Sequence, residues 1–233
     1  MNRELLLQRL EENPFQSLNH IVYQMLEEAI LSFELLPKTK LNSAKIAKDL
    51  QISRTPIKEA FRTLCKEGLV ERREDKNGYY VFTFSRQMTE ELFFARRVIE
   101  GTACYLCAQH NRSVDVRQLR YYAEEFREIL HTKQYTKLDE TDIPFHKIIV
   151  QAAGNPFLVT MYETLDKMIR YQSARNAHYL LSTGQVEYKM DGLALQHLSI
   201  LKAIESGIPE MAQSAAHAHI DTCVEFTRLH PMY

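Results

Sequence analysis

Glycine and proline are scarce in this sequence, which has seven of each among its 233 residues. Glycine weakens a helix through its backbone entropy, and proline lacks the N–H group that a helix interior requires. Long stretches without them, with apolar residues at three- and four-residue spacing, therefore predict a mostly α-helical protein. A hydrophobic content of 45% can supply a core, and the length allows one large domain or two modest ones.

The first 85 residues combine helices with a short β-rich segment. Residues 16–36 have a helical pattern that ends before a proline, and Asn42 is suited to cap a second helix. A tight break leads to a third helix that begins at Ser53. The segment LVERREDKNGYYVFTF then has two β-rich arms around an Asn-Gly pair, which predicts a hairpin. This order predicts a winged helix-turn-helix domain at residues 1–85.

From residue 86 onward the pattern is helical and contains no convincing strand. Breaks fall near residues 111–113, 131–135, 154–156, 182–184 and 207–209. They divide this half into six or seven helices. We therefore predict an all-α bundle at residues 86–233, behind the small domain with its β-hairpin.

Positive charge is concentrated in one part of the first domain. The whole chain has a net charge of −1, yet residues 38–76 carry eleven Lys or Arg against six Asp or Glu. Residues 1–37 carry two Arg against six Glu. Duplex DNA presents a phosphate charge about every 1.7 Å along its axis, so a local basic surface is enough for docking. The alternative is an ordinary solvated amphipathic helix.

The third helix is placed as the recognition helix of the helix-turn-helix pair, which favours DNA binding over that alternative. Its N-terminus offers hydroxyls and free N–H groups suited to phosphate. Arg54, the first arginine of this helix, is our candidate for a base contact, because a guanidinium can pair bidentately with guanine. Lys58 is a candidate for a base or a phosphate contact, and Arg62 for a phosphate contact or a simple surface charge. The candidate DNA-binding residues here are Ser53, Arg54, Thr55, Lys58 and Arg62 on the helix, and Arg72 on the hairpin.

Cysteine usage and hydropathy predict a soluble cytoplasmic protein. The four cysteines are too few and too scattered for a disulfide framework, which suits a reducing compartment. Cys104 and Cys107 form a lone CxxC inside a helical stretch, where packed helix surface is the favoured interpretation. The first residues do not resemble a signal peptide, and no apolar run reaches membrane-spanning length.

Helical phase separates the histidines of the second half. Asp142 and His146 are four residues apart and share an apolar helix face, as His197 does with its apolar neighbours. His219 also faces inward, whereas His217 is turned roughly 160° away by the same periodicity. One inward histidine is usually a satisfied core residue. Three of them with an aspartate predict a divalent metal site, with zinc favoured and nickel or manganese as alternatives.

The first half resembles the DNA-binding domain of GntR-type bacterial transcription regulators. The resemblance is carried by LNSAKIAKDLQISRTPIKEAFRTLCKEGLVERREDKNGYYV and is strongest over residues 46–70. It implies a homodimer on a palindromic double-stranded operator. It also implies DNA contacts from Ser53, Arg54, Thr55 and Lys58 on the helix and from Gly78 on the hairpin. Ala44 stands where an arginine is common, and Lys58 replaces the usual arginine, so we expect a somewhat different operator.

The second half is similar to the FCD domain, the all-α effector domain of the FadR branch of that family. The resemblance rests on Asp142 and His146 four apart, His197 and His219 22 apart, and GNPF at 154–157. It implies that the four side chains converge on a metal. Acyl-CoA-binding members of the branch lack this set, so the resemblance argues against that effector class.

Arg96 is predicted to face inward with Leu92 and Ile99. It is either a structural partner of Glu100 one turn on or, as the FCD resemblance implies, the group that binds an effector carboxylate. A metal with open positions beside a guanidinium would hold a small organic acid. We therefore expect a DNA-binding transcription regulator controlled by such an acid, and no catalytic residues.

Two alternatives remain from the sequence. A metal-dependent hydrolase would use the same ligand set to activate water, but no further inward base accompanies it and the basic helix would be unexplained. A regulator with a purely structural metal and no small-molecule effector is the other alternative.

Overall fold

The computed structural model describes residues 2–75, 77–110, 114–183 and 188–229. The chain divides into two compact units between Thr83 and Phe84, two residues before the boundary expected from the sequence. The described residues are mostly helical, with ten α-helices and one small antiparallel sheet, as the sparse glycine and proline predicted. The two units are described separately below.

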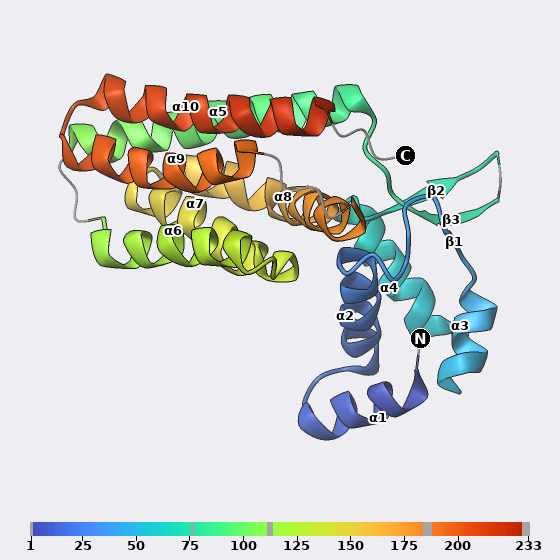
Figure 1. The fold of residues 1–233 in the computed structure, drawn as a ribbon. Coiled ribbons are helices and arrows are strands. Elements are labelled where there is room, and N and C mark those ends of the chain that lie inside the picture. Colours follow the sequence, from blue (N-terminus) through green and yellow to red (C-terminus); the bar gives the residue numbers. More distant parts are fainter. Residues whose placement is uncertain (1, 76, 111–113, 184–187, 230–233) are drawn as a thin grey trace. The chain divides into compact units, whose positions relative to one another are not determined.

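The first unit contains four helices and three strands (Figure 1). The helices are α1 (Arg3–Glu12), α2 (Leu18–Leu31), α3 (Ser43–Leu50) and α4 (Arg54–Lys66). The strands are β1 (Lys40–Leu41), β2 (Val70–Arg73) and β3 (Gly78–Val81), in the antiparallel order β1-β3-β2. The fold is the predicted winged helix-turn-helix, with α1 and β1 in addition.

The helix expected over residues 16–36 is shorter in the structure, because α2 ends at Leu31. Phe33 adopts a left-handed conformation with φ 61°, and the Leu35 N–H donates to the Ala29 carbonyl at 2.8 Å. These two features turn the chain back over the helix end, five residues before the expected stop. The proline was therefore the wrong stop signal.

The helix-turn-helix pair has local causes. Asn42 caps α3 as predicted, since its Oδ1 accepts from the N–H groups of Ala44 and Lys45 at 3.0 Å each. Gln51 is left-handed with φ 55°, and the Ile52 N–H returns to the Ala47 carbonyl, which makes the tight turn before α4. Packing of α2 against α4 buries side chains of both helices completely, among them Ile21, Val22, Leu26, Ile57 and Phe61.

The predicted hairpin forms, but its loop is longer than an Asn-Gly turn. In the ladder Val70 pairs with Val81 and Arg73 pairs with Gly78. Four residues therefore separate the strands, and Asn77, with φ 40°, is the last of them. Gly78 is the first residue of β3. β1 completes the sheet along the other edge of β3.

The described residues of the second unit form a bundle of six α-helices, the lower of the two numbers expected. They are α5 (Arg86–Gln109), α6 (Val116–His131), α7 (Asp139–Ala152), α8 (Pro156–Thr183), α9 (Tyr188–Glu205) and α10 (Pro209–Leu229), with a 3-10 turn at Tyr135–Lys137. α5 and α10 lie side by side along their length (Figure 1). The predicted breaks at 131–135, 154–156 and 207–209 are confirmed. The break at 111–113 lies outside the described residues. Of the break at 182–184, Ser182 and Thr183 still belong to α8, and Gly184 lies outside the described residues.

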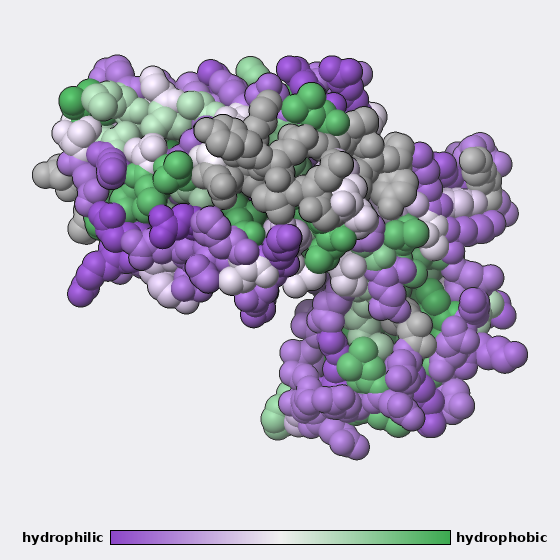
Figure 2. Space-filling view, in the orientation of Figure 1, coloured by the Kyte–Doolittle hydropathy of each residue, from purple (hydrophilic) through white to green (hydrophobic). Residues whose placement is uncertain are grey.

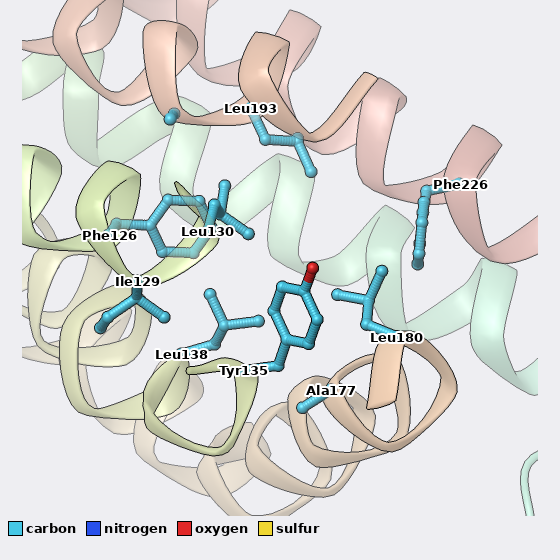
Figure 3. Close-up of a cluster of buried hydrophobic side chains, with 10 residues drawn as sticks. Phe126, Ile129, Leu130, Tyr135, Leu138, Ala177, Leu180, Leu193 and Phe226 are labelled. Atoms are coloured by element: carbon cyan, nitrogen blue, oxygen red, sulfur yellow. The ribbon is translucent and has the colours of Figure 1, made fainter. Parts of the chain in front are cut away.

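A cluster of buried side chains joins α6, α8, α9 and α10 in this bundle. Figure 3 shows its aromatic and aliphatic side chains, with the hydroxyl of Tyr135 pointing inward among them. Phe126, Leu138, Leu193 and Phe226 belong to this cluster and also line a cavity described below. The apolar core therefore forms part of the wall of the candidate site.

Hydrophilic residues cover most of the face that Figure 2 shows, and smaller hydrophobic areas interrupt them. Within the part of the chain that the structure describes, no helix combines the length and the apolar character needed to cross a membrane.

Candidate functional site

Three helices bring four side chains to one point in the bundle. Asp142 and His146 come from α7, His197 from α9 and His219 from α10. One ligand atom of each lies within 4.8 Å of the corresponding atoms of the other three. His197 is fully buried, and the side chain of Asp142 retains 17% exposure. The packing of the bundle thus brings together four side chains that the sequence could only assign to three separate helices.

Helical phase predicted the orientation of the α10 histidines correctly. His219 is buried, with 2% exposure, whereas His217 is only half-buried. The His217 imidazole packs instead against α5 at Gly101. A Cβ at Gly101 would lie only 2.3 Å from His217 Nε2, so the ring occupies the space that the glycine leaves open. His217 is therefore outside the cluster.

The cluster contains more nitrogen atoms than its own hydrogen bonds can satisfy. His146 Nε2, both ring nitrogens of His197 and His219 Nδ1 are buried without a hydrogen-bond partner among the described residues. The carboxylate of Asp142 approaches His197 Nε2 at 3.3 Å and His146 Nε2 at 3.6 Å, but neither contact has hydrogen-bond geometry. Leaving such groups unpaired costs about 1–3 kcal/mol each. Three imidazoles with unsatisfied ring nitrogens beside one carboxylate fit a divalent cation.

Glu100 on α5 is not one of the four clustered residues, but it holds one of them in place through a hydrogen bond. Its Oε2 accepts from His146 Nδ1 at 2.8 Å, and its Oε1 accepts from Arg96 Nε at 2.7 Å. A carboxylate on the far nitrogen of a histidine fixes the ring and leaves the other nitrogen free for a metal. The sequence indicated Glu100 only as a partner of Arg96. Its bond to His146 was missed, because no local pattern links α5 to α7.

Electrostatics in this region are strong because all the groups are buried. Burial alone would lower the pKa of His146, but Glu100 and Asp142 outweigh it and raise that pKa to about 9. Burial alone would raise the pKa of Glu100, yet Arg96 and His146 lower it to about 2. Burial lowers the pKa of His197 and, with the help of the neighbouring histidines, that of His219.

Arg96 has one guanidinium nitrogen to spare. It is 5% exposed and, as predicted, faces inward, whereas Arg97 is on the outside and pairs with Asp221. The predicted ion pair with Glu100 is present. However, Arg96 Nη2 is buried without a hydrogen-bond partner in the described chain. The ion pair therefore uses only part of its donor capacity.

A cavity of about 50 Å³ adjoins Arg96, Asp142 and His219. A cavity needs about 10–15 Å³ to hold one water molecule, so this cavity has room for about four waters or one small organic molecule. Cys223 also lines it, with Sγ 3.9 Å from His219 Nε2. The CxxC of α5 is separate: Cys104 and Cys107 are packed in the core as expected, and Cys107 Sγ donates to the Ile149 carbonyl.

The basic residues of α4 are free at the surface of the first unit. Arg54, Lys58 and Arg62 are exposed, and none of them has an ion pair with a described residue. Ser53 is the N-cap residue of α4, but its side chain makes no capping hydrogen bond. The hydroxyl and the first N–H groups of the helix, together with exposed Thr55, are thus available to a phosphate group.

The other two candidates for DNA contacts, Arg72 and Gly78, lie on the β-hairpin that follows this helix in the sequence. Arg72 is exposed on β2 and pairs in register with Tyr79. Gly78 is half-buried, and a Cβ there would meet Lys40 Cε at 3.0 Å. A larger residue at Gly78 would therefore push the lysine aside.

A winged helix-turn-helix unit with a free basic helix, followed by a helical bundle, defines a class of DNA-binding regulators. Residues 18–81 match the family model described as bacterial regulatory proteins, gntR family, and residues 91–222 match the FCD domain. This chain belongs to the GntR family and carries an FCD domain. It is a DNA-binding transcription regulator, and the proteins it resembles are regulators rather than enzymes.

Relatives and solved structures agree with this assignment. The HTH-type transcriptional repressor RspR of Escherichia coli K12 is 25% identical over 220 residues, covering 93% of this chain and 91% of that protein. A probable D-xylose utilization operon transcriptional repressor of Paenarthrobacter nicotinovorans is 29% identical over 180 residues, covering 76% and 74%. In fold, the chain is similar to a putative GntR regulator from Rhodococcus sp. RHA1, with TM-score 0.73, 18% identity and coverage of 93% and 100%. E. coli McbR/YncC has TM-score 0.71, 16% identity and coverage of 92% and 99%.

Proposed function

We propose that a small carboxylate, bound at a divalent metal in the helical unit, controls the operator affinity of this regulator. The observation that carries the proposal is the convergence of three histidines that have unsatisfied ring nitrogens with one aspartate, next to a cavity with a spare guanidinium donor. Asp142, His146, His197 and His219 would hold the metal. Zinc is the favoured ion, because it binds imidazole and carboxylate and can expand from four to five ligands to accept an oxygen of the effector, and nickel and manganese are the alternatives.

Each residue of the site has a separate task in this proposal. The metal supplies a Lewis-acidic centre for carboxylate oxygens. Arg96 donates from Nη2 to the same carboxylate, while its Nε remains on Glu100. Glu100 also holds the His146 ring through Nδ1, so Arg96, Glu100 and His146 are connected by two short hydrogen bonds. A ligand bound to Arg96 is thereby linked through Glu100 to His146, one of the proposed metal ligands.

On DNA, we propose that α4 enters the major groove. Arg54 would contact a base edge, Lys58 a base or a phosphate, and Ser53 and Thr55 the phosphates at the helix start. Arg62 and Arg72 would add phosphate contacts, and Gly78 would let the hairpin approach the backbone. Two copies of the chain would bind a palindromic operator in the cytoplasm. Ligand-dependent placement of the two DNA-binding units then changes operator affinity, because the half-sites are about one helical turn apart.

Replacing Arg96 tests the effector role. We expect Arg96→Gln to lower the affinity of the metal-loaded protein for small carboxylates at least tenfold, because a charge-assisted contact is lost. Calorimetric titration with propanoate and 2-hydroxypropanoate measures the change. Arg97→Gln, which removes the neighbouring half-buried arginine that pairs with Asp221 outside the cavity, is the control and should leave affinity unchanged. Full affinity in Arg96→Gln would show that the arginine serves only the ion pair with Glu100.

Metal binding should release a proton. The pKa of His146 is about 9 in the metal-free protein, so this ring is protonated at pH 7.5, and a metal requires its neutral form. The lowered pKa values of His197 and His219 mean that those rings are already neutral. We expect about one proton to be released at pH 7.5 and zinc affinity to rise about tenfold per pH unit between pH 6.5 and 8. Calorimetry in buffers of different ionisation enthalpy counts the proton, and a count of zero would contradict a protonated His146 ring in the metal-free protein.

A purely structural metal is the main alternative. It predicts that the protein binds zinc but that no carboxylate changes its thermal stability or its DNA binding. Hydrolysis of esters or amides by the zinc-loaded protein would instead support the enzyme alternative.

A further inference from the structure

Gln172 on α8 is a buried polar residue of the cavity that the metal site does not use. It is 2% exposed and lines the cavity together with Ser173 and Asn176 from the same helix. Its Nε2 donates to Asn176 Oδ1 at 3.0 Å, while its Oε1 is buried without a hydrogen-bond partner among the described residues. An amide oxygen in this position needs a donor, and the cavity is the place from which a ligand can supply one.

The apolar part of the same cavity restricts the size and character of a ligand. Phe93, Phe126 and Phe226 line it with two leucines, and its volume is about 50 Å³. A short hydrocarbon chain can pack against these rings, whereas a polyhydroxylated chain would leave hydroxyl groups without partners there. The polar groups of the ligand must therefore be few.

Charge restricts the ligand further. With a divalent metal in place, the metal and Arg96 would contribute three positive charges, and Glu100 and Asp142 two negative ones. The remaining single positive charge matches one carboxylate. A second carboxylate on the ligand would be buried without a cation, and an ammonium group would add to the positive charge.

We propose that the effector is a small hydroxy monocarboxylic acid whose hydroxyl group donates to Gln172 Oε1. This inference rests on the carboxylate role of the site proposed above and adds the residue that selects among acids. The carboxylate lies at Arg96, the hydroxyl at Gln172 and the short hydrocarbon against the phenylalanines. A site that offers a buried acceptor discriminates against an analogue without the matching donor, because the acceptor is then left unpaired.

Acids of equal size test the selection. The zinc-loaded protein is titrated calorimetrically with propanoate, 2-hydroxypropanoate, 3-hydroxypropanoate, 2-oxopropanoate and propanedioate, and then with the corresponding four-carbon acids. We expect one hydroxy acid to bind about tenfold more tightly than the 2-oxo and unsubstituted acids of the same carbon number. The dicarboxylates should bind more weakly than the monocarboxylates.

Gln172→Met removes the acceptor at similar side-chain length. We expect it to reduce the preference for the hydroxyl to less than about twofold while the unsubstituted acid keeps its affinity. Gln196→Met is the matched control: Gln196 also has an unpartnered Oε1 and bonds Thr222, but it does not line the cavity. Gln172→Glu is a second variant, in which the acceptor oxygen remains and a negative charge is added. All the acids should therefore bind more weakly, while the preference for the hydroxy acid persists.

The outcomes separate this inference from the proposed function. If acids bind wild-type protein but the 2-oxo or unsubstituted acid binds as tightly as every hydroxy acid, Gln172 does not select the ligand and the inference fails alone. If the preference survives in Gln172→Met, another residue carries it. If no acid of the panel binds zinc-loaded protein, the carboxylate role itself is overturned.

Discussion

Zinc added to the metal-free wild-type protein is expected to raise its melting temperature by about 10 °C. A ligand at about a thousand times its dissociation constant stabilises the folded state by about 4 kcal/mol, and 1 kcal/mol corresponds to about 2–4 °C for a chain of this size. Four ligands from α7, α9 and α10 would tie these helices together. We expect His219→Ala to reduce the zinc-dependent shift to below about 3 °C.

His217→Ala provides the matched control for that experiment. It removes the same side chain two residues earlier on α10, from a half-buried position against α5 rather than from the cluster. Its zinc-dependent shift should equal that of the wild type. Circular dichroism of each metal-free variant shows whether it is folded, and elemental analysis then measures how much metal the folded variant holds. Equal shifts in His219→Ala and wild type would refute the ligand assignment of His219.

Arg54→Ala is expected to lower affinity for the operator by about 5- to 150-fold, because one bidentate arginine–guanine contact is worth about 1–3 kcal/mol. A binding selection from randomised DNA with the wild-type protein supplies the operator sequence for the measurement. In the variant, discrimination should be lost mainly at one base position of each half-site. Fluorescence anisotropy on the selected site and on single-base variants measures both effects.

Two further variants make the result specific. Arg62→Ala should weaken binding to all sequences alike and reduce the salt dependence by about one phosphate contact. Lys202→Ala removes an exposed lysine of α9 in the helical unit and should leave DNA binding unchanged. A uniform loss in Arg54→Ala, without relaxed discrimination, would reassign that arginine to the phosphate backbone.

Features with local causes were predictable from the sequence. The Asn42 cap, the hairpin and the break before Ser53 each depend on a few neighbouring residues. The inward phase of Arg96 and His219 follows from helix periodicity in the same way. Where a local signal was ambiguous, prediction was less successful. The end of α2 was placed too late because a left-handed Phe33 has no strong sequence signal, and the hairpin loop proved to be longer than an Asn-Gly turn.

The sequence by itself indicated candidate residues for DNA contacts and determined which side chains turn toward the core, since spacing along a single helix sets the face on which each side chain lies. Only the tertiary structure decided that α7, α9 and α10 meet, that Glu100 links Arg96 to His146, and that Gln172 faces the same cavity as Arg96. The physical reason is that periodicity fixes the direction of a side chain relative to its own helix axis. Distances between helices depend on how their apolar faces pack, and no local pattern encodes them.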